Sequence, residues 1–235
     1  MVMQAAAPPV PEHYRRLGFV ESGRDDCLAV APMTFDEYLA LDQEAGLVEW
    51  VNGEARLYMS ANNKHQMIAL FLSSLLRLFA EVTGSGVVRT GPYAMRPRPG
   101  MPAREPDVLF VRSEHAARIT QDYLDGPADL VIEIISPDST IRDSQEKFLE
   151  YESSGIPEYW LIDARPGRQA ASFYQLRDGR YVPIPVDDAG YYTSAVLPGF
   201  RLQVDRLWDD EPAVMPALQE ALAAAEAAET SQPAE

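Results

Sequence analysis

The residues Gly126 to Trp160 read GPADLVIEIISPDSTIRDSQEKFLEYESSGIPEYW, and this stretch decides the fold. Within it, Asp129 to Ile135 is an apolar, β-branched run bounded by prolines, which predicts a short strand buried on both faces. Glu133 interrupts the apolar pattern. A carboxylate in a buried strand is costly unless it is neutralised, hydrogen-bonded or bound to a cation, so Glu133 requires an explanation.

A turn with helix-capping residues is expected over 136–143, followed by an amphipathic helix that contains Lys147. Upstream, the segment REPDVLFVR at Arg104–Arg112 places Asp107 after a proline, where it opens another apolar strand. If the two strands pair, Asp107 and Glu133 can project from neighbouring strands into one cleft. Lys147 would reach into the same cleft from the helix.

Two carboxylates and a lysine around one point predict a divalent-metal site, because hard cations take carboxylate oxygens and an ammonium can contact a phosphate. Each residue alone also has a structural explanation. Glu133 could be a satisfied or edge-exposed strand residue, and Asp107 could be a turn residue where a strand starts. The combination favours the functional interpretation.

Spaced motifs in this part of the chain resemble those of one family. They are Pro-Asp-Val around Asp107, DLVIEIISP at Asp129–Pro137, the segment Asp143–Tyr151 with its lysine, and GIPEYWLID at Gly155–Asp163. From about Met33 to Trp208 the chain is similar to the Uma-two family of restriction-endonuclease-like proteins, a branch of the PD-(D/E)xK nuclease superfamily. The resemblance implies an α/β (α+β) fold with a restriction-endonuclease-like mixed central sheet flanked by helices.

The resemblance also implies Asp107 and Glu133 as metal ligands. The lysine that the wider superfamily carries two residues after the glutamate is Ile135 here. In the Uma-two family its role is assigned to a lysine on the following helix, which matches Lys147. The substitution leaves the catalytic geometry open.

Two β-hairpins are predicted, one near each end of the expected domain. Leu47–Met59 contains two alternating runs around Asn-Gly, and 170–186 contains two further runs around Asp-Gly, both strong hairpin signals. By the resemblance, an acid of the first hairpin lies near the active site. Glu49 matches better than Glu54, although acids on a surface hairpin are common.

Two helices are predicted before the first acidic strand. Thr34 followed by Glu37 is a capping-box pattern for a short helix, and Lys64–Val82 is apolar enough for a mostly buried one. His65 lies in the first turn of the second helix. A lone histidine there is more often structural, but the resemblance places one near the cleft.

Composition limits the domain organisation. With 235 residues and 46% hydrophobic content, we expect one core, with a flexible arm at 1–31, a nuclease-like domain at 32–208 and an acidic, Ala-rich tail or helix at 209–235. The single cysteine, Cys27, excludes an internal disulfide and fits a reducing cytoplasm. No run approaches the length of a membrane span, so we expect a cytoplasmic protein without a membrane partner.

The charge argues against a polynucleotide substrate, because a net charge of -16 repels a polyanion at long range. Arginines 89, 96, 98, 104 and 112 could form a local basic strip, or equally a solvated loop and strand edge. The chain holds 18 arginines but two lysines, Lys64 and Lys147. This weakly favours a specific role for Lys147, since an ammonium acts as a compact point charge.

The leading hypothesis is a Mg²⁺- or Mn²⁺-dependent endonuclease acting on nucleic acid, more specifically DNA, with a homodimer as the expected assembly. Asp107, Glu133 and the Ile134 carbonyl would hold the metal, Lys147 would orient water or stabilise charge, and Glu49 or His65 would complete an outer shell or a second metal site. Two alternatives stay open: a non-catalytic nuclease-fold module for binding or assembly, and a small-nucleotide phosphoesterase, which suits the negative surface better.

Overall fold

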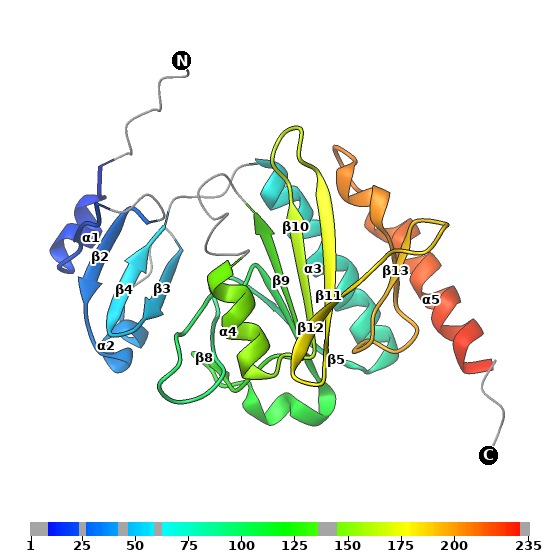
Figure 1. The fold of residues 1–235 in the computed structure, drawn as a ribbon, viewed down its shortest axis with the longest axis horizontal. Coiled ribbons are helices and arrows are strands. Elements are labelled where there is room, and N and C mark those ends of the chain that lie inside the picture. The colour runs from blue at the N-terminus through cyan, green and yellow to red at the C-terminus, as the bar shows by residue number, and fades with distance from the viewer. Residues whose placement is uncertain (1–8, 24–26, 42–46, 59–62, 136–144, 231–235) are drawn as a thin grey trace.

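A computed structural model describes residues 9–23, 27–41, 47–58, 63–135 and 145–230 of the chain. Its main feature is a six-stranded mixed sheet of order β12-β11-β10-β9-β7-β5 (Figure 1). Strands β9 and β10 run parallel, and the other neighbours run antiparallel. The strands are β5 (Gly86–Thr90), β7 (Val108–Arg112), β9 (Leu130–Ile135), β10 (Glu158–Asp163), β11 (Ala170–Arg177) and β12 (Arg180–Ile184).

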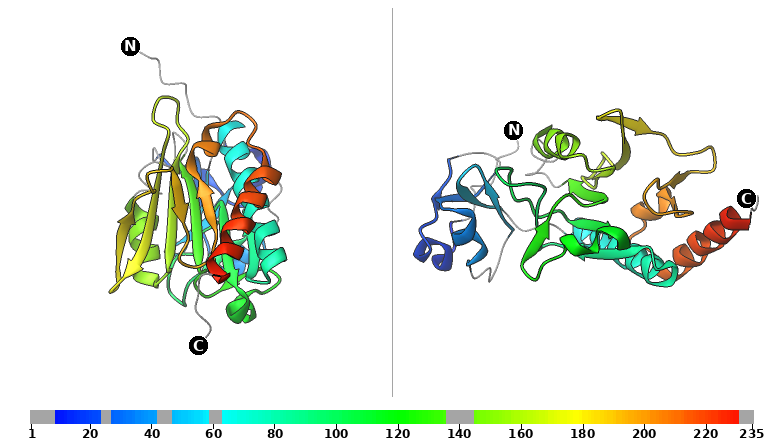
Figure 2. Two further views of the ribbon diagram at one scale, coloured as in Figure 1. Left: turned by 90° about the vertical axis from the view of Figure 1, so that its right-hand side faces the viewer. Right: turned by 90° about the horizontal axis from the view of Figure 1, so that it is seen from below.

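Helices cover both faces of this sheet, with α3 (Asn63–Thr83) and α5 (Val214–Thr230) on one face and α4 (Lys147–Ser154) on the other (Figure 2). Strand β9 contributes side chains to the cores on both faces of the sheet. Leu130, Ile132 and Ile134 belong to the core that contains α3 and α5, and Val131 and Ile135 belong to the core that contains α4. The predicted fold class is therefore confirmed, and so is the prediction that this strand is buried on both faces.

A second sheet of order β1-β2-β4-β3 lies beside the first, with the short helices α1 (Glu12–Arg16) and α2 (Phe35–Leu39) (Figure 1). Its strands are β1 (Val20–Glu21), β2 (Ala29–Pro32), β3 (Val48–Val51) and β4 (Glu54–Leu57). The structure thus corrects the description of residues 1–31 as a flexible arm: within its described part, Tyr14 and Phe19 are buried and β2 pairs with β4.

Local sequence signals account for several of these elements. Thr34 and Glu37 form the predicted capping box at the start of α2. Both predicted hairpins are present, because β3 pairs with β4 and β11 pairs with β12. Their central residues all have positive φ, namely Asn52 (51°), Gly53 (88°), Asp178 (50°) and Gly179 (76°), as a type I′ turn requires. The predicted turn at 136–143 lies outside the described residues.

Residues Ala103 and Arg104 link the second sheet to a separate two-stranded sheet. Ala103 bridges Trp50 of β3, and Arg104 bridges Met95 of β6 (Ala94–Arg96), which in turn pairs with β8 (Tyr123–Asp125). The antiparallel register at Trp50 sets Glu49 opposite Arg104, on one face of this junction. That face is turned toward α4, because Arg104 donates hydrogen bonds to Glu150 of this helix.

Helix α3 also tests the prediction that no segment resembles a membrane span. Its length and apolar composition do suit one, so that prediction is wrong for this helix. In the structure it is a core helix, because Leu72, Leu75 and Phe79 are fully buried in one cluster with strands β7 and β9. For the C-terminal segment, which the sequence left as tail or helix, the structure has the helix α5, packed along α3.

Candidate active site at the junction of the two sheets

Asp107 and Glu133 lie next to each other across strands β7 and β9. The antiparallel register pairs Val108 with Ile132, and one further step sets Asp107 opposite Glu133. A hydrogen bond from the Ile134 N–H to Asp107 Oδ2 (2.7 Å) agrees with this position. The Asp107 side chain keeps 20% of its surface exposed, whereas Glu133 is buried. One carboxylate therefore faces the solvent edge and the other faces the interior.

Lys147, in the first turn of α4, is the cation that neutralises Glu133. Its Nζ lies 2.9 Å from Glu133 Oε1 and 2.9 Å from Glu49 Oε1, and its side chain is 1% exposed. The lysine thus links three elements, since Glu133 belongs to β9 and Glu49 to β3. The buried glutamate that the sequence singled out has a cationic partner, and this partner is the predicted lysine.

Arg104 extends this chain of charges in the other direction. Its Nη1 lies 3.0 Å from Glu49 Oε2, while its Nε and Nη2 donate to the two oxygens of Glu150 at 2.8 and 2.7 Å. Glu146 lies 3.5 Å from Nη2. Burial alone would lower the pKa of Arg104, but Glu49 and Glu150 raise that pKa well above its usual value. The guanidinium is therefore a permanent cation between β3 and α4.

Tyr151, one turn after Lys147 on α4, is a site residue that the sequence did not single out. Its hydroxyl donates to Glu133 Oε1 at 2.7 Å. Burial, together with the nearby charges of Glu133 and Glu49, raises the pKa of Tyr151 well above its usual value, so the hydroxyl keeps its proton. The spacing of four residues after Lys147 is the signal that could have identified it, because both side chains then share one helix face.

His65 reaches the same end of the sheet from the first turn of α3. Its Nε2 lies 3.2 Å from Asp107 Oδ2, and the ring is buried. Of the two acids predicted for the first hairpin, Glu49 faces the site, whereas Glu54 pairs with Arg56 on β4 at 2.8 Å. The structure therefore brings together Asp107 with His65 and Ile134, and Glu133 with Lys147 and Glu49.

The proposed basic strip of five arginines is not a single feature. Arg104 is buried in the site, and the Arg96 guanidinium stacks 4.1 Å above the Phe35 ring. Arg98 donates to the carbonyl of Ser153, and Arg112 donates to the carbonyl of Val196. These four arginines tie separate segments together, whereas Arg89 is exposed and donates to the carbonyl of its neighbour Val88. The five therefore form neither one basic strip nor one solvated edge.

The donor set of the site fits a divalent cation in its chemistry. Asp107 and Glu133 supply hard carboxylate oxygens, and an ammonium already occupies the position beside Glu133 that a cation would take. Among the described residues, no three His, Cys, Asp or Glu side chains are already grouped as a ligand set.

The acids around the junction outnumber the bases. Four carboxylates contact the two cations Lys147 and Arg104, namely Glu49, Glu133, Glu146 and Glu150, and a fifth, Asp107, adjoins Glu133. A surplus of negative charge in a largely buried cluster attracts cations and repels phosphate. A phosphate substrate would therefore require additional positive charge at this point.

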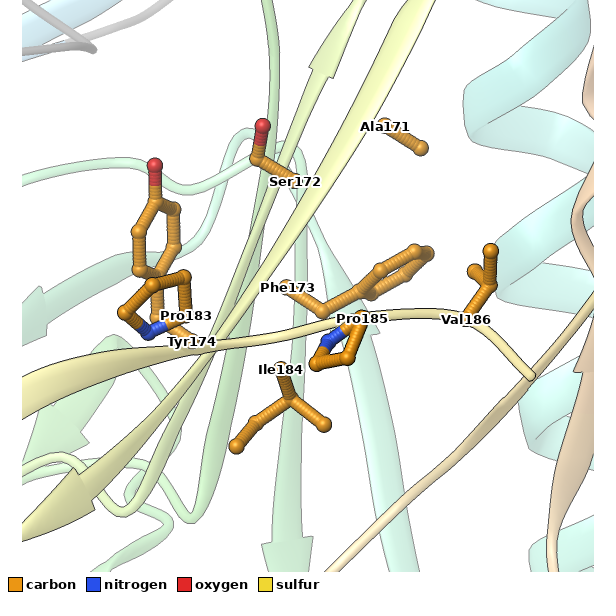
Figure 3. Close-up of a pocket in the computed structure, with 8 residues that line it drawn as sticks. All are labelled: Ala171, Ser172, Phe173, Tyr174, Pro183, Ile184, Pro185 and Val186. Carbon is orange, nitrogen blue, oxygen red and sulfur yellow. The ribbon is translucent and has the colours of Figure 1, made fainter.

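A separate pocket lies on the C-terminal hairpin, lined by residues of β11 and β12 together with Pro185 and Val186 (Figure 3). Its lining is mainly apolar, with Ser172 and Tyr174 as the polar side chains. No residue of the site described above lines it. The charged junction, rather than this pocket, is therefore the candidate active site.

Comparison with known proteins bears on the fold and on the family of the chain. One solved structure with a similar fold is that of a putative nuclease belonging to DUF820 from Anabaena variabilis ATCC 29413, with 20% sequence identity and a TM-score of 0.60 over 75% of this chain and 98% of that chain. No curated protein matches the chain. The model of the Uma2 family, described as "putative restriction endonuclease", matches residues 35–205. Because this match spans most of the chain, the protein belongs to the Uma2 (Uma-two) family of nuclease-like proteins.

Proposed function

We propose that this protein is a metal-dependent endonuclease that hydrolyses phosphodiester bonds in DNA, with Mg²⁺ or Mn²⁺ as the cofactor. The observation that carries the proposal is the convergence of Asp107, Glu133 and Lys147 at one end of strands β7 and β9. Family membership supports the nuclease class. The metal and the DNA substrate are our own extension of it.

Asp107 and Glu133 would hold the cation, with the carbonyl of Ile134 as a backbone ligand. Asp107 suits this role because its side chain is partly exposed while His65 and the Ile134 N–H fix one of its oxygens. Tyr151 fixes Glu133 in the same way from the interior. When bound, a divalent cation supplies Lewis-acid chemistry, which polarises the phosphate and makes an attacking water more acidic.

Lys147 would stabilise the negative charge that grows on the phosphoryl oxygens, or orient the attacking water. An ammonium suits both tasks because it is a compact donor. Glu49 would hold the Lys147 ammonium in place, since its carboxylate oxygen Oε1 is 2.9 Å from Nζ. His65 would orient Asp107, with which it is in contact.

The second candidate is a non-catalytic module that keeps the fold for binding or assembly. The burial of Lys147 between two carboxylates favours it, because the same ion pairs would serve a purely structural role. The net charge of -16 favours it as well, or else a phosphoesterase for small nucleotides. The three candidates predict different cleavage: the endonuclease cuts polynucleotides, the phosphoesterase hydrolyses small nucleotides, and the binding module cleaves neither.

Cleavage of supercoiled plasmid and of single-stranded oligonucleotides, with Mg²⁺, Mn²⁺ or EDTA, tests the proposal. Wild type should cut in either metal and not in EDTA. Asp107→Ala and Lys147→Ala should each lower the rate by at least about 100-fold, the size of effect seen when one charge-stabilising group is removed. Lys64→Ala is the matched control, because Lys64 contacts the backbone carbonyls of Trp208 and Asp209 instead of an acid of the site.

Each other result selects a different candidate. Cutting that persists undiminished in Asp107→Ala and Lys147→Ala would place the activity elsewhere. Hydrolysis of nucleotides without cutting of polynucleotides would indicate the phosphoesterase. A wild type that leaves every substrate intact in both metals would overturn the endonuclease and favour the binding module.

A further inference from the structure

Lys147 shares its ammonium equally between two carboxylates. Nζ is 2.9 Å from Glu49 Oε1 and 2.9 Å from Glu133 Oε1, in a position that is 1% exposed. A fully buried ammonium is stable only next to negative charge, so it cannot leave one partner unless it keeps another. The structure provides both partners at once.

The two carboxylates differ in how they are held. Glu49 is 0% exposed, its Oε2 receives a hydrogen bond from Arg104 at 3.0 Å, and its Oε1 receives one from the Glu105 N–H at 3.4 Å. Glu133 adjoins Asp107, which is at the solvent edge of the site. Asp107 therefore presents a partly exposed carboxylate next to Glu133, whereas Glu49 is enclosed and contacts Lys147, Arg104 and the Glu105 N–H.

A divalent cation at Glu133 would compete with Lys147. The carboxylate cannot serve both cations fully, and two like charges at neighbouring positions repel each other. Lys147 would then keep its contact with Glu49. Because Arg104 keeps Glu49 in place independently of Lys147, this second partner would persist after Glu133 is taken.

We propose that Glu49 is a positioning residue that retains Lys147 when a divalent cation takes Glu133, so that lysine and cation compete for Glu133. This inference rests on the proposed metal-dependent function. It assigns Glu49 a role other than a metal ligand. It also explains why a catalytic lysine can be buried in an ion pair before the metal arrives: the pair with Glu133 is the one that is exchanged.

Binding of Mg²⁺ and Mn²⁺, followed by calorimetry, tests the competition without measuring activity. Lys147→Met removes the competitor, so the metal affinity of this variant should be about 10-fold higher than that of wild type. Glu49→Gln removes the carboxylate that retains Lys147, so the metal affinity of that variant should be about 10-fold lower. Lys64→Met should bind as wild type does. Glu133→Gln should abolish binding.

A second measurement uses the wild type and needs no destabilising variant. With two lysines in the chain, protein that carries ¹³C and ¹⁵N in lysine gives two side-chain signals, which Lys64→Met assigns. Saturating Mg²⁺ should shift the Lys147 signal along the same binding curve that calorimetry gives. The Lys64 signal should stay in place.

The outcomes separate this inference from the proposed function. If wild type shows no saturable metal binding, the proposed function fails and this inference fails with it. If wild type binds metal but Lys147→Met binds no more tightly and Glu49→Gln binds equally well, only the competition is overturned. Should the variants not fold, a Lys147 signal that stays unchanged while metal binds to wild type would overturn it.

Discussion

Arg104 is the residue that ties β3 of the second sheet to helix α4 and to β6. It lies on no strand of either sheet, yet it bridges Met95, faces Glu49 across the junction and holds Glu150 of α4 with two hydrogen bonds. A guanidinium can do this because its planar fork offers several donors in fixed directions. Lysine could not make the same set of contacts, which accounts for arginine at this position and lysine at 147.

Replacement of Arg104 by Met should therefore destabilise the fold strongly. The change leaves Glu49 buried beside Lys147 with one cation fewer, and breaking a buried pair costs about 3–5 kcal/mol. Urea unfolding, compared at equal protein concentration, measures the loss. Arg16→Met is the matched control, because Arg16 is 76% exposed in its pair with Glu12 and should cost no more than about 1 kcal/mol. Equal losses for the two variants would contradict the structural role of Arg104.

The two hairpins permit a comparison of elements within one molecule. Both turn on a glycine at positive φ, Gly53 at 88° and Gly179 at 76°, and in both a Cβ would meet open space. Alanine at either position should thus cost only the backbone strain, about 1–2 kcal/mol. The hairpins differ in what they carry, because β3 bears Glu49 and the C-terminal hairpin bears no site residue.

Gly53→Ala and Gly179→Ala should accordingly lower the free energy of unfolding by similar amounts, as measured by urea titration. Both variants should keep the metal affinity of the wild type if the pairing of β3 with β4 holds its register. A Gly53→Ala variant that alone loses metal binding would show that the hairpin has slipped. A slip of one residue would turn Glu49 to the opposite face.

Elements with a strong local signal could be predicted, and elements that depend on tertiary pairing could not. The capping box of α2, both hairpins, the apolar run of α3 and the buried strand β9 all follow from spacing and composition. Strand β1 has two residues and β2 has four, with a proline among them, so no alternation distinguishes them from a loop. They exist because β2 pairs with β4.

The same division applies to the candidate site. Glu133 was identifiable because a charge within an apolar strand is costly. Lys147 was identifiable because the family resemblance expects a lysine on the helix after that strand, with the rarity of lysine in this chain as weak support. The role of Arg104 depends on the bridge between Trp50 and Ala103, a contact across more than fifty residues that leaves no local pattern. Arginine 104 therefore looked in sequence like any member of a basic strip.

At the scale of the whole molecule, acidic groups determine how stability depends on pH. Hydrogen bonds and nearby arginines lower the pKa of the carboxyls of Glu152, Asp163 and Asp187. Each of these groups stabilises the fold above its unfolded pKa, and this contribution is lost as the pH falls through its folded pKa. Glu158 acts in the opposite direction, since burial raises its pKa and its contribution is lost as the pH rises through the folded value. The pKa of Glu37 is lowered as well, so among the described residues four lowered carboxyls against one raised carboxyl predict a net loss of stability in acid.

Glu152 provides the test, because it ties α4 to the C-terminal hairpin. Its pKa is lowered from 4.5, first by the hydrogen bond from the Tyr181 N–H (2.7 Å) and then by Arg180 (2.8 Å). The unfolded chain takes up the proton at a higher pH than the folded one, so the free energy of unfolding should decrease as the pH falls below about 4.5. Urea unfolding at intervals from pH 7 to pH 3 measures this slope.

Glu152→Gln removes the titrating group but retains an oxygen that can accept the Tyr181 N–H. The variant should be less stable than wild type at pH 7, and the difference should shrink toward zero as the pH falls through the folded pKa of Glu152, because the wild type then also carries a neutral side chain. Glu81→Gln, an exposed change on α3, should follow the wild-type curve. A constant difference between Glu152→Gln and wild type across the whole range would mean that the carboxylate charge plays no part in fastening the hairpin to α4. The contact between the hairpin and α4 would then depend on hydrogen bonds and packing alone.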